Sequence, residues 1–127
     1  EVINAMWQAV TGFGFTGGRI LEPAAGIGHF FGLMPQALAE QSELVAVEKD
    51  LISGQILQLL YPSVETYLSG FEQCQFDAGS FDLVVGNVPF GSYSVYDRHN
   101  ADLSTLPIHN YFIGRAARLV RPGGLVV

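Results

Sequence analysis

Apolar positions along the chain switch between helical spacing and short continuous runs, and this pattern predicts the order of the elements. Val2 to Val10 has apolar residues at helical spacing, and Gly18 to Glu22 is expected to be a strand. A helix should follow Gly28, and Pro35 should break it and start a second short helix, because proline lacks an amide hydrogen. The residues expected to face inward from these helices are Val2, Met6, Ala9, Val10, Phe30, Met34, Ala37 and Leu38.

The middle of the chain repeats this strand and helix pattern. Glu43 to Glu48 alternates as a second strand, and Asp50 is placed to cap the next helix. Pro62 should end that helix, and Val64 to Leu68 has the composition of a third strand. The helical residues expected to face the sheet are Ile52, Ile56, Leu59 and Leu60.

The last part of the chain predicts two more strands around one helix. Ser80 to Gly86 contains a near-continuous apolar run, which is typical of a strand covered on both faces. Pro107 to Leu119 is expected to be a helix, and Arg121 to Gly124 should turn the chain into a fifth strand, Leu125 to Val127. Ser92 to Leu106 has no clear pattern and is expected to be a mobile or partner-dependent loop. The helical residues expected to face inward are Ile108, Phe112, Ala116 and Leu119.

Strands separated by helices predict an α/β fold with a mostly parallel, Rossmann-like sheet and right-handed crossovers. With 127 residues, 49% of them hydrophobic and 14% charged, the chain (1–127) is expected to be one globular domain. It begins at Glu1 and stops at Val127, inside the fifth strand. We therefore expect a fragment of a longer protein, with its sheet truncated after the fifth strand.

Composition narrows the class of partner. No apolar run is long enough for a membrane span and nothing resembles a signal peptide, so no membrane partner is expected. A single cysteine, Cys74, cannot form an internal disulfide, which favours a cytoplasmic location. The net charge of −6 argues against this chain binding a polyanion such as a nucleic acid by itself. No metal site is expected, because His29, His99 and His109 do not cluster with cysteines or acids.

Polar or glycine-rich sequence follows four strands, and in a parallel sheet these ends converge. The first is the turn Glu22-Pro23-Ala24-Ala25-Gly26-Ile27-Gly28. Its glycine spacing differs from the G-x-G-x-x-G that seats a pyrophosphate, so it favours a cofactor without phosphates. The second is Glu48, 20 residues after Gly28, which is placed to accept hydrogen bonds from ribose hydroxyls. The alternative for Glu48 is a solvated charge beside Lys49.

The third and fourth strand ends carry aromatic residues. In Ser69 to Glu72, Phe71 is a candidate to pack on a purine ring, and the alternative is a phenylalanine tucked under its loop. The fourth end, Gly86-Asn87-Val88-Pro89-Phe90-Gly91, directly follows the buried strand. An asparagine followed by a proline and an aromatic residue in a rigid turn is an unusual way to leave a strand.

These motifs resemble those of a known family. Asn87-Val88-Pro89-Phe90 resembles the Asn-Pro-Pro-Tyr/Phe motif of amino-group methyltransferases, and Glu22 to Gly28 resembles their S-adenosylmethionine-binding motif. With Val45 to Glu48 and Arg121 to Gly124 in the same order, the resemblance covers nearly the whole chain. It is nearest to the adenine-N6 DNA methyltransferases, in particular the large bacterial methylase–helicase type found on mobile elements.

The resemblance implies a function. It implies S-adenosylmethionine as cofactor and methylation of adenine N6 in DNA, and it leaves open whether the setting is restriction-modification, defence or regulation. It also implies DNA contacts mainly outside this fragment, room for a helicase domain in the same full-length chain, and a fragment that is inactive alone.

The resemblance also assigns roles to residues. The Asn87 side-chain oxygen and the Val88 carbonyl would bind the two hydrogens of the target amino group, and Phe90, after Pro89, would stack on the base. Glu22 and the amides near Gly26 and Gly28, in the turn with Pro23 and Ala24, would hold the amino acid end of the cofactor. Glu48 would hold its ribose, and Phe71 with Glu72 would flank its adenine. Two positions depart from the family: Val88 stands where proline is usual, and Gly70 stands where many relatives have an acid.

Other functions remain open at this point. The same motif serves methylation of a protein glutamine amide or of a guanine amino group in RNA, although Phe90 favours adenine because relatives acting on glutamine generally carry tyrosine. A catalytically silent cofactor-binding module is a further alternative. A nicotinamide dehydrogenase is disfavoured by the glycine spacing, and a cytosine-C5 nucleophile at Cys74 is disfavoured because no proline precedes it. Asp97 to His99 is expected to be a solvated loop, and His109 is expected to cap or pack.

Overall fold

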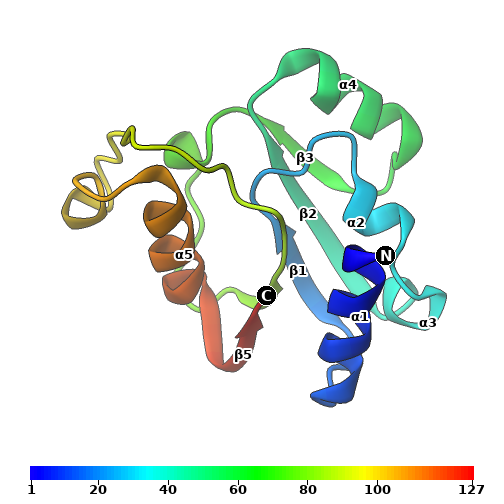
Figure 1. The fold of residues 1–127 in the computed structure, drawn as a ribbon. Helices are drawn as coiled ribbons and strands as arrows, with labels where there is room; N and C mark the ends of the chain where they lie inside the picture. Colours follow the sequence, from blue (N-terminus) through cyan, green and yellow to red (C-terminus); the bar gives the residue numbers. More distant parts are fainter.

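The five strands form one sheet in the order β3-β2-β1-β4-β5, and every neighbouring pair is parallel. The computed structural model describes residues 1–127. The predicted parallel α/β sheet is thereby confirmed (Figure 1). The first four strands lie within two residues of their predicted bounds. The strands are β1 (Gly18–Glu22), β2 (Ser42–Glu48), β3 (Glu65–Leu68), β4 (Phe81–Val84) and β5 (Val120–Val126).

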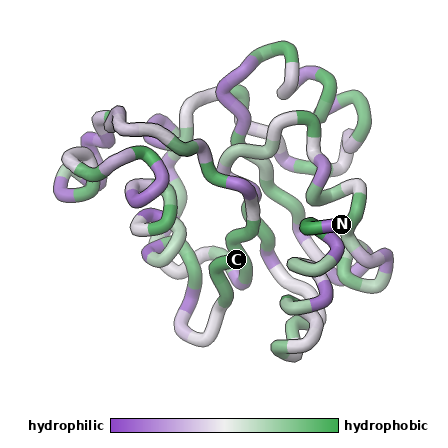
Figure 2. Tube along the Cα trace, in the orientation of Figure 1, coloured by the Kyte–Doolittle hydropathy of each residue, from purple (hydrophilic) through white to green (hydrophobic).

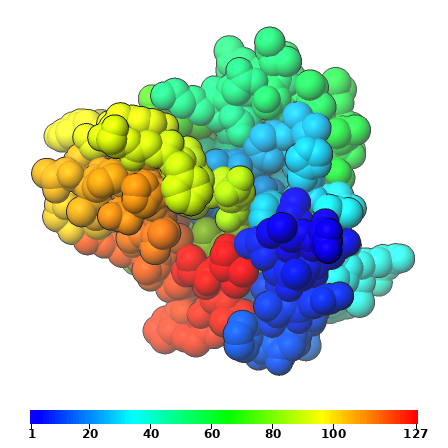
Figure 3. Space-filling view, viewed as in Figure 1, coloured from blue at the N-terminus to red at the C-terminus, as the bar shows by residue number.

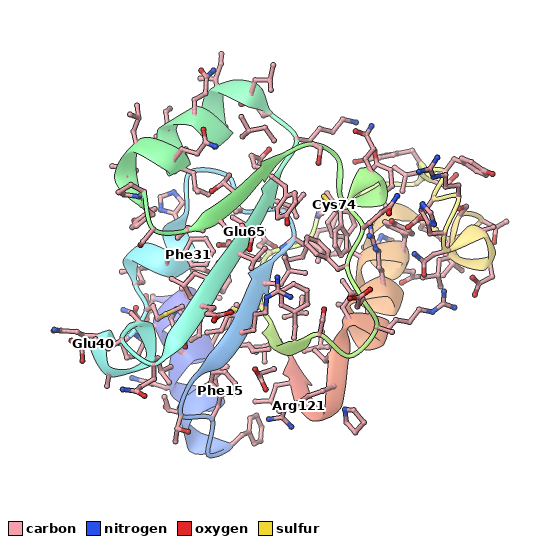
Figure 4. All side chains as sticks on the ribbon, turned by 180° about the vertical axis from the view of Figure 1, so that it is seen from behind. Phe15, Phe31, Glu40, Glu65, Cys74 and Arg121 are labelled. Carbon is pink, nitrogen blue, oxygen red and sulfur yellow. The ribbon has the colours of Figure 1, made fainter.

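Helices cover both faces of the sheet. Leu21, Val45 and Val47 pack against α5 on one face, whereas Ile20 and Ala46 pack toward α1 and α4 on the other. Figure 1 shows α5 on one side of the sheet and α1 to α4 on the opposite side. Figure 4 shows the same division from behind, with Cys74 on the α5 side and Phe31 on the other. The elements are α1 (Val2–Gly12), α2 (His29–Gly32), α3 (Gln36–Ala39), α4 (Leu51–Leu60), η1 (Phe71–Gln73), η2 (Ala101–Leu103) and α5 (Ile108–Leu119).

The predicted helix breaks and caps are largely confirmed. Pro35 is the N-cap of α3 and separates it from α2. Asp50 caps α4, because its Oδ1 accepts a 2.8 Å hydrogen bond from the Ser53 amide. The predicted inward positions of α1 to α3 are partly wrong, since Val2, Ala9 and Ala37 are exposed. Trp7 provides the main anchor of α1 instead: it is buried, and its Nε1 donates to the Phe30 carbonyl.

The predicted buried face of α4 is wrong. Ile52 is 70% exposed and Leu59 is 83% exposed, and Ile56 and Leu60 are exposed as well. Gly54 and Leu57 face the protein interior, because a Cβ on Gly54 would collide with the Leu68 side chain on β3. The close approach of helix and strand selects the glycine side of α4 and leaves its apolar residues exposed. In Figure 2, α4 includes green, hydrophobic stretches at the periphery of the fold.

The fifth strand begins earlier than predicted. It starts at Val120, directly after α5, and includes the segment Arg121 to Gly124 that was expected to be a turn. Val120 pairs with Phe81 and Leu125 pairs with Leu83, so extra residues of β5 bulge between these two pairs. Gly123 lies in this bulge with a φ of +80°. The predicted pairing of the last residues as a strand is confirmed.

The segment from Ser92 to Leu106 is anchored, and the prediction of a solvated Asp97 is wrong. Asp97 is 1% exposed and accepts hydrogen bonds from the amides of His99 and Asn100. Leu103, in η2, packs into the hydrophobic core. Asp97 is buried because the α5 residues Tyr111 and Arg115 supply it with polar partners. None of the helices has the length and apolar character needed to cross a membrane.

Candidate functional site

The carboxyl ends of β1 and β4 lie side by side. Leu21 pairs with Val84, and the Val85 amide donates a 3.0 Å hydrogen bond to the Leu21 carbonyl. A Cβ on Gly86 would lie 3.5 Å from both Glu22 Cγ and Pro23 Cδ. The glycine turn and the Asn87 motif therefore leave the sheet at adjacent points. Figure 3 shows the yellow-green segment after β4 beside the blue segment after β1.

The glycine turn has the conformation that its sequence predicts. Gly26 and Gly28 have φ angles of +56° and +87°, which L side chains rarely adopt. Gly26 faces open space, whereas Gly28 packs against the ring of Tyr61. The Gly26 amide donates a 2.6 Å hydrogen bond to Glu48 Oε2, and Glu48 Oε1 accepts from the Asp50 amide at 2.7 Å. Glu48 is therefore tied to the turn and is not merely a solvated charge.

Glu22 is buried at this edge without a polar partner for one of its oxygens. Its exposed fraction is 2%, and Oε2 has no hydrogen bond. Burial, and then the negative charge of Glu48, raise the pKa of Glu22 to about 9. A buried polar atom without a partner is rare in folded proteins and calls for an explanation. The position of Glu22 beside an open turn favours a ligand group as that partner.

A hollow lies where the four strand ends converge. It encloses about 200 Å³. Binding sites for drug-sized ligands span roughly 300–1,000 Å³, so a larger ligand would extend beyond it. Six predicted site residues line it, namely Pro23, Ala24, Glu48, Phe71, Glu72 and Pro89. The remaining lining residues are Lys49, Ser69, Gly70, Tyr93, Val95, Ile108 and Phe112.

Phe71 lines the hollow but does not offer a free ring face. It is 2% exposed, the Arg115 guanidinium lies 4.1 Å above its ring, and the Phe112 ring lies 5.0 Å away. The alternative of a phenylalanine tucked under its loop is therefore what the structure has.

The Asn87 motif follows the carboxyl end of β4 and extends toward solvent. Asn87 is exposed, Val88 and Pro89 are half-buried, and Val88 packs against the core on the α5 side. Phe90 is 76% exposed, and its ring stacks on His109 at a centroid distance of 5.6 Å. The predicted packing role of His109 is confirmed, but Pro107 is the N-cap of α5 and no side chain caps that helix. Sequence reasoning missed this stack because the two residues are far apart in the chain.

The sequence disfavoured two further kinds of site, a nucleophile at Cys74 and a metal centre. Cys74 is buried, and burial raises the pKa of its thiol. Its Sγ lies 3.2 Å from Ser69 Oγ. A buried thiol with a raised pKa is a poor nucleophile. No group of three or more His, Cys, Asp and Glu side chains is arranged to hold a metal ion.

The fold is that of S-adenosylmethionine-dependent methyltransferases. The structure is similar to a SAM-dependent O-methyltransferase from Thermotoga maritima, with a TM-score of 0.67, 13% identity, and coverage of 98% of this chain and 42% of that one. It is also similar to a TehB-like SAM-dependent methyltransferase from Corynebacterium glutamicum, with a TM-score of 0.62, 18% identity, and coverage of 98% and 59%. At these identities the likeness defines the fold alone.

In sequence, the chain is similar to the protein called defense against restriction protein B of Escherichia phage P1. The two are 33% identical over an alignment of 130 positions, and this alignment covers 98% of this chain. The chain spans about 6% of the length of that relative. No family model matches the chain.

Proposed function

We propose that this chain is the core of an enzyme that transfers a methyl group from S-adenosylmethionine to the N6 amino group of adenine in DNA. The observation that carries the proposal is the juxtaposition at the β1 and β4 ends. A buried carboxyl with an unpartnered oxygen, Glu22, lies beside an open glycine turn and next to the start of the Asn87 motif. The proposed cofactor-binding corner (Glu22 to Gly28) and the proposed substrate-orienting corner (Asn87 to Phe90) are therefore neighbours.

The residues at the first corner fit the cofactor. An ammonium group is the partner that the unpaired Oε2 of Glu22 lacks. Gly26 leaves room for close approach to the main chain, since nothing lies within 4 Å of the position of its absent Cβ. Glu48 provides carboxylate oxygens for ribose hydroxyls, and the hollow beyond it offers apolar and polar groups for a purine. S-adenosylmethionine, when bound, supplies an electrophilic methyl group on a sulfonium.

The second corner addresses the low nucleophilicity of an aromatic amino group, whose lone pair is delocalised into the ring. Asn87 has a side-chain oxygen, and Val88 has a main-chain carbonyl, that can each accept one hydrogen of that amino group. Two acceptors in this arrangement draw the nitrogen toward tetrahedral geometry and aim its lone pair. The contribution of these residues is positioning and electrostatics, without a covalent enzyme intermediate.

Phe90 supports a nucleobase as the acceptor. Its ring is 76% exposed while its orientation is held by the stack on His109, so one face stays free for a planar substrate. A target base within duplex DNA must be flipped out of the helix, which costs a few kcal/mol, and stacking on an aromatic ring offsets part of that cost.

The phage relative favours DNA over protein or RNA as the substrate. Its name concerns defence against restriction, and modification of DNA bases is a chemical route to such protection. The chain has a net charge of −6 and offers little for phosphate binding. The proposal therefore assigns most of the DNA contacts, and the target specificity, to other parts of a longer polypeptide.

The proposal is tested by offering the intact gene product three acceptors with a labelled methyl donor: adenine-containing DNA, a protein with exposed glutamines, and RNA. We expect label in DNA, recovered as N6-methyladenine by mass spectrometry of the digested nucleosides. Label found only in protein, or only in guanine of RNA, would replace DNA as the substrate. Cofactor binding with no label in any acceptor would favour a silent binding module.

A further inference from the structure

A buried cluster of Asp97, Tyr111 and Arg115 packs against Phe71, which lines the hollow, and has no part in the proposed chemistry. The three residues are 1%, 0% and 3% exposed. Tyr111 Oη donates a 2.7 Å hydrogen bond to Asp97 Oδ2, and Arg115 Nη1 donates to Tyr111 Oη at 3.0 Å. Arg115 Nη1 also lies 3.6 Å from Asp97 Oδ2. The cluster joins α5 to the loop that follows the Asn87 motif.

Asp97 fixes one wall of the hollow. Its Oδ1 accepts hydrogen bonds from the amides of His99 and Asn100, at 2.8 and 3.1 Å. Its own amide donates to Ser104 Oγ at 2.9 Å. Tyr93 and Val95, which line the hollow, belong to the same loop just before Asp97. The position of this wall therefore depends on a carboxylate that is bound both by amides of its own loop and by Tyr111 on α5.

Arg115 fixes a second wall. Its guanidinium donates to the main-chain carbonyls of Phe71, the first residue of η1, and Cys74, which directly follows η1. The same guanidinium lies over the Phe71 ring at 4.1 Å. Gly70, Phe71 and Glu72 line the hollow. Both walls are therefore hydrogen-bonded to neighbouring side chains within one buried cluster.

Stability alone does not account for such a cluster. Buried ionic groups carry a desolvation penalty, and well-packed apolar residues of similar volume often stabilise a protein as well or better. A network of charged hydrogen bonds does, however, fix geometry more sharply than apolar packing. The carbonyls of Phe71 and Cys74 and the amides of His99 and Asn100 are held by directional bonds.

We propose that Asp97, Tyr111 and Arg115 are positioning residues that set the spacing of the two walls for the adenosine part of the cofactor. This inference rests on the proposed function, because it assumes that the hollow holds a nucleoside. The walls offer apolar contacts from Val95 and Phe112 and polar groups from Ser69 and Glu72, which suits a purine. The three residues would act through the wall geometry without touching the ligand.

The test compares two probes by calorimetry: S-adenosylhomocysteine, and methylthioadenosine, which lacks the amino acid. We expect Asp97→Asn to weaken both probes about tenfold and Tyr111→Phe about threefold, since each removes a hydrogen bond of the cluster. The matched control is Arg118→Gln. Arg118 pairs with Asp102 and donates to Asn100 Oδ1, so it also joins α5 to the same loop, but it is exposed, lines no part of the hollow and makes no hydrogen bond to Asp97. The affinities of Arg118→Gln for both probes should stay within about twofold of those of the native chain.

Two further readouts separate positioning from stability alone. All affinities are measured below the onset of unfolding of each variant, so loss of folded protein does not contribute. The variant Asp97→Asn combined with Tyr111→Phe should weaken binding by less than the product of the single effects, because both act on one network. Tyr111→Phe decides the matter if Asp97→Asn does not fold. Lower melting temperatures with unchanged affinities would overturn the inference, whereas no binding of either probe to the native chain would overturn the proposed function.

Discussion

Replacing Glu22 with glutamine is expected to stabilise the ligand-free protein above neutral pH. The pKa of Glu22 is about 9 in the folded state against an ordinary value of 4.5. Between these pH values the folded state holds a proton that the unfolded state has released, so the free energy of unfolding falls as pH rises. One such group contributes a slope of about −1.4 kcal/mol per pH unit. Glu22→Gln should remove this slope, because the amide does not titrate.

The measurement is urea unfolding of the native chain and Glu22→Gln at pH 6, 7 and 8. Glu43→Gln serves as the control, because Glu43 is an exposed residue on the neighbouring strand β2. We expect the control to follow the native chain and Glu22→Gln to show a flatter profile. Parallel profiles for all three proteins would show that Glu22 is not held protonated in the folded state.

The same substitution is expected to weaken cofactor binding. The amide cannot pair with an ammonium group as a carboxylate does, so affinity for S-adenosylhomocysteine should fall on the order of 10- to 100-fold. Methylthioadenosine, which has no ammonium group, should bind Glu22→Gln as it binds the native chain. The affinity of the native chain for S-adenosylhomocysteine should also rise from pH 6 to pH 8, because binding favours the ionised carboxylate. Equal affinity of S-adenosylhomocysteine for both proteins would remove Glu22 from the cofactor site.

The second large effect is expected at Asn87. Asn87→Ala removes one of the two acceptors for the target amino group, so methyl transfer should fall by about 10²–10³-fold or more. The affinity for S-adenosylhomocysteine should change by less than about threefold, because Asn87 does not line the hollow. Single-turnover formation of N6-methyladenine by the intact gene product measures the first quantity, and calorimetry measures the second.

The matched control for this variant is Asn4→Ala, because Asn4 is an exposed asparagine on α1. It should leave both methyl transfer and cofactor affinity unchanged. Full activity in Asn87→Ala would refute the acceptor role. Loss of cofactor binding together with activity would indicate that Asn87 supports the cofactor corner instead.

The sheet and its strand ends could be predicted because they depend on local patterns. Apolar runs, the glycines after Glu22 and the proline after Asn87 each act within a few residues. The buried face of α4 could not be predicted in this way. The number of apolar residues favoured Ile52 and Leu59, whereas the space beside Leu68 admits only the glycine side of the helix.

The functional surroundings were the least accessible to sequence reasoning. Asp97 is one polar residue in an irregular loop, and its partner Tyr111 lies 14 residues away on a helix. Glu22 was identified as a strand-end acid, but its missing hydrogen-bond partner depends on how the turn and β4 close around it. Burial and pairing of single polar groups follow from tertiary contacts, which have no periodic pattern in the chain.

The most direct test of the account is a titration of the isotope-labelled 127-residue chain with S-adenosylhomocysteine, followed by amide chemical shifts. We predict that shifts concentrate at Glu22 to Gly28, Lys49, Ser69 to Glu72 and Asn87 to Tyr93, while α4 and β5 stay unchanged. Shifts that cluster away from the β1 and β4 ends, or none at millimolar ligand, would contradict it.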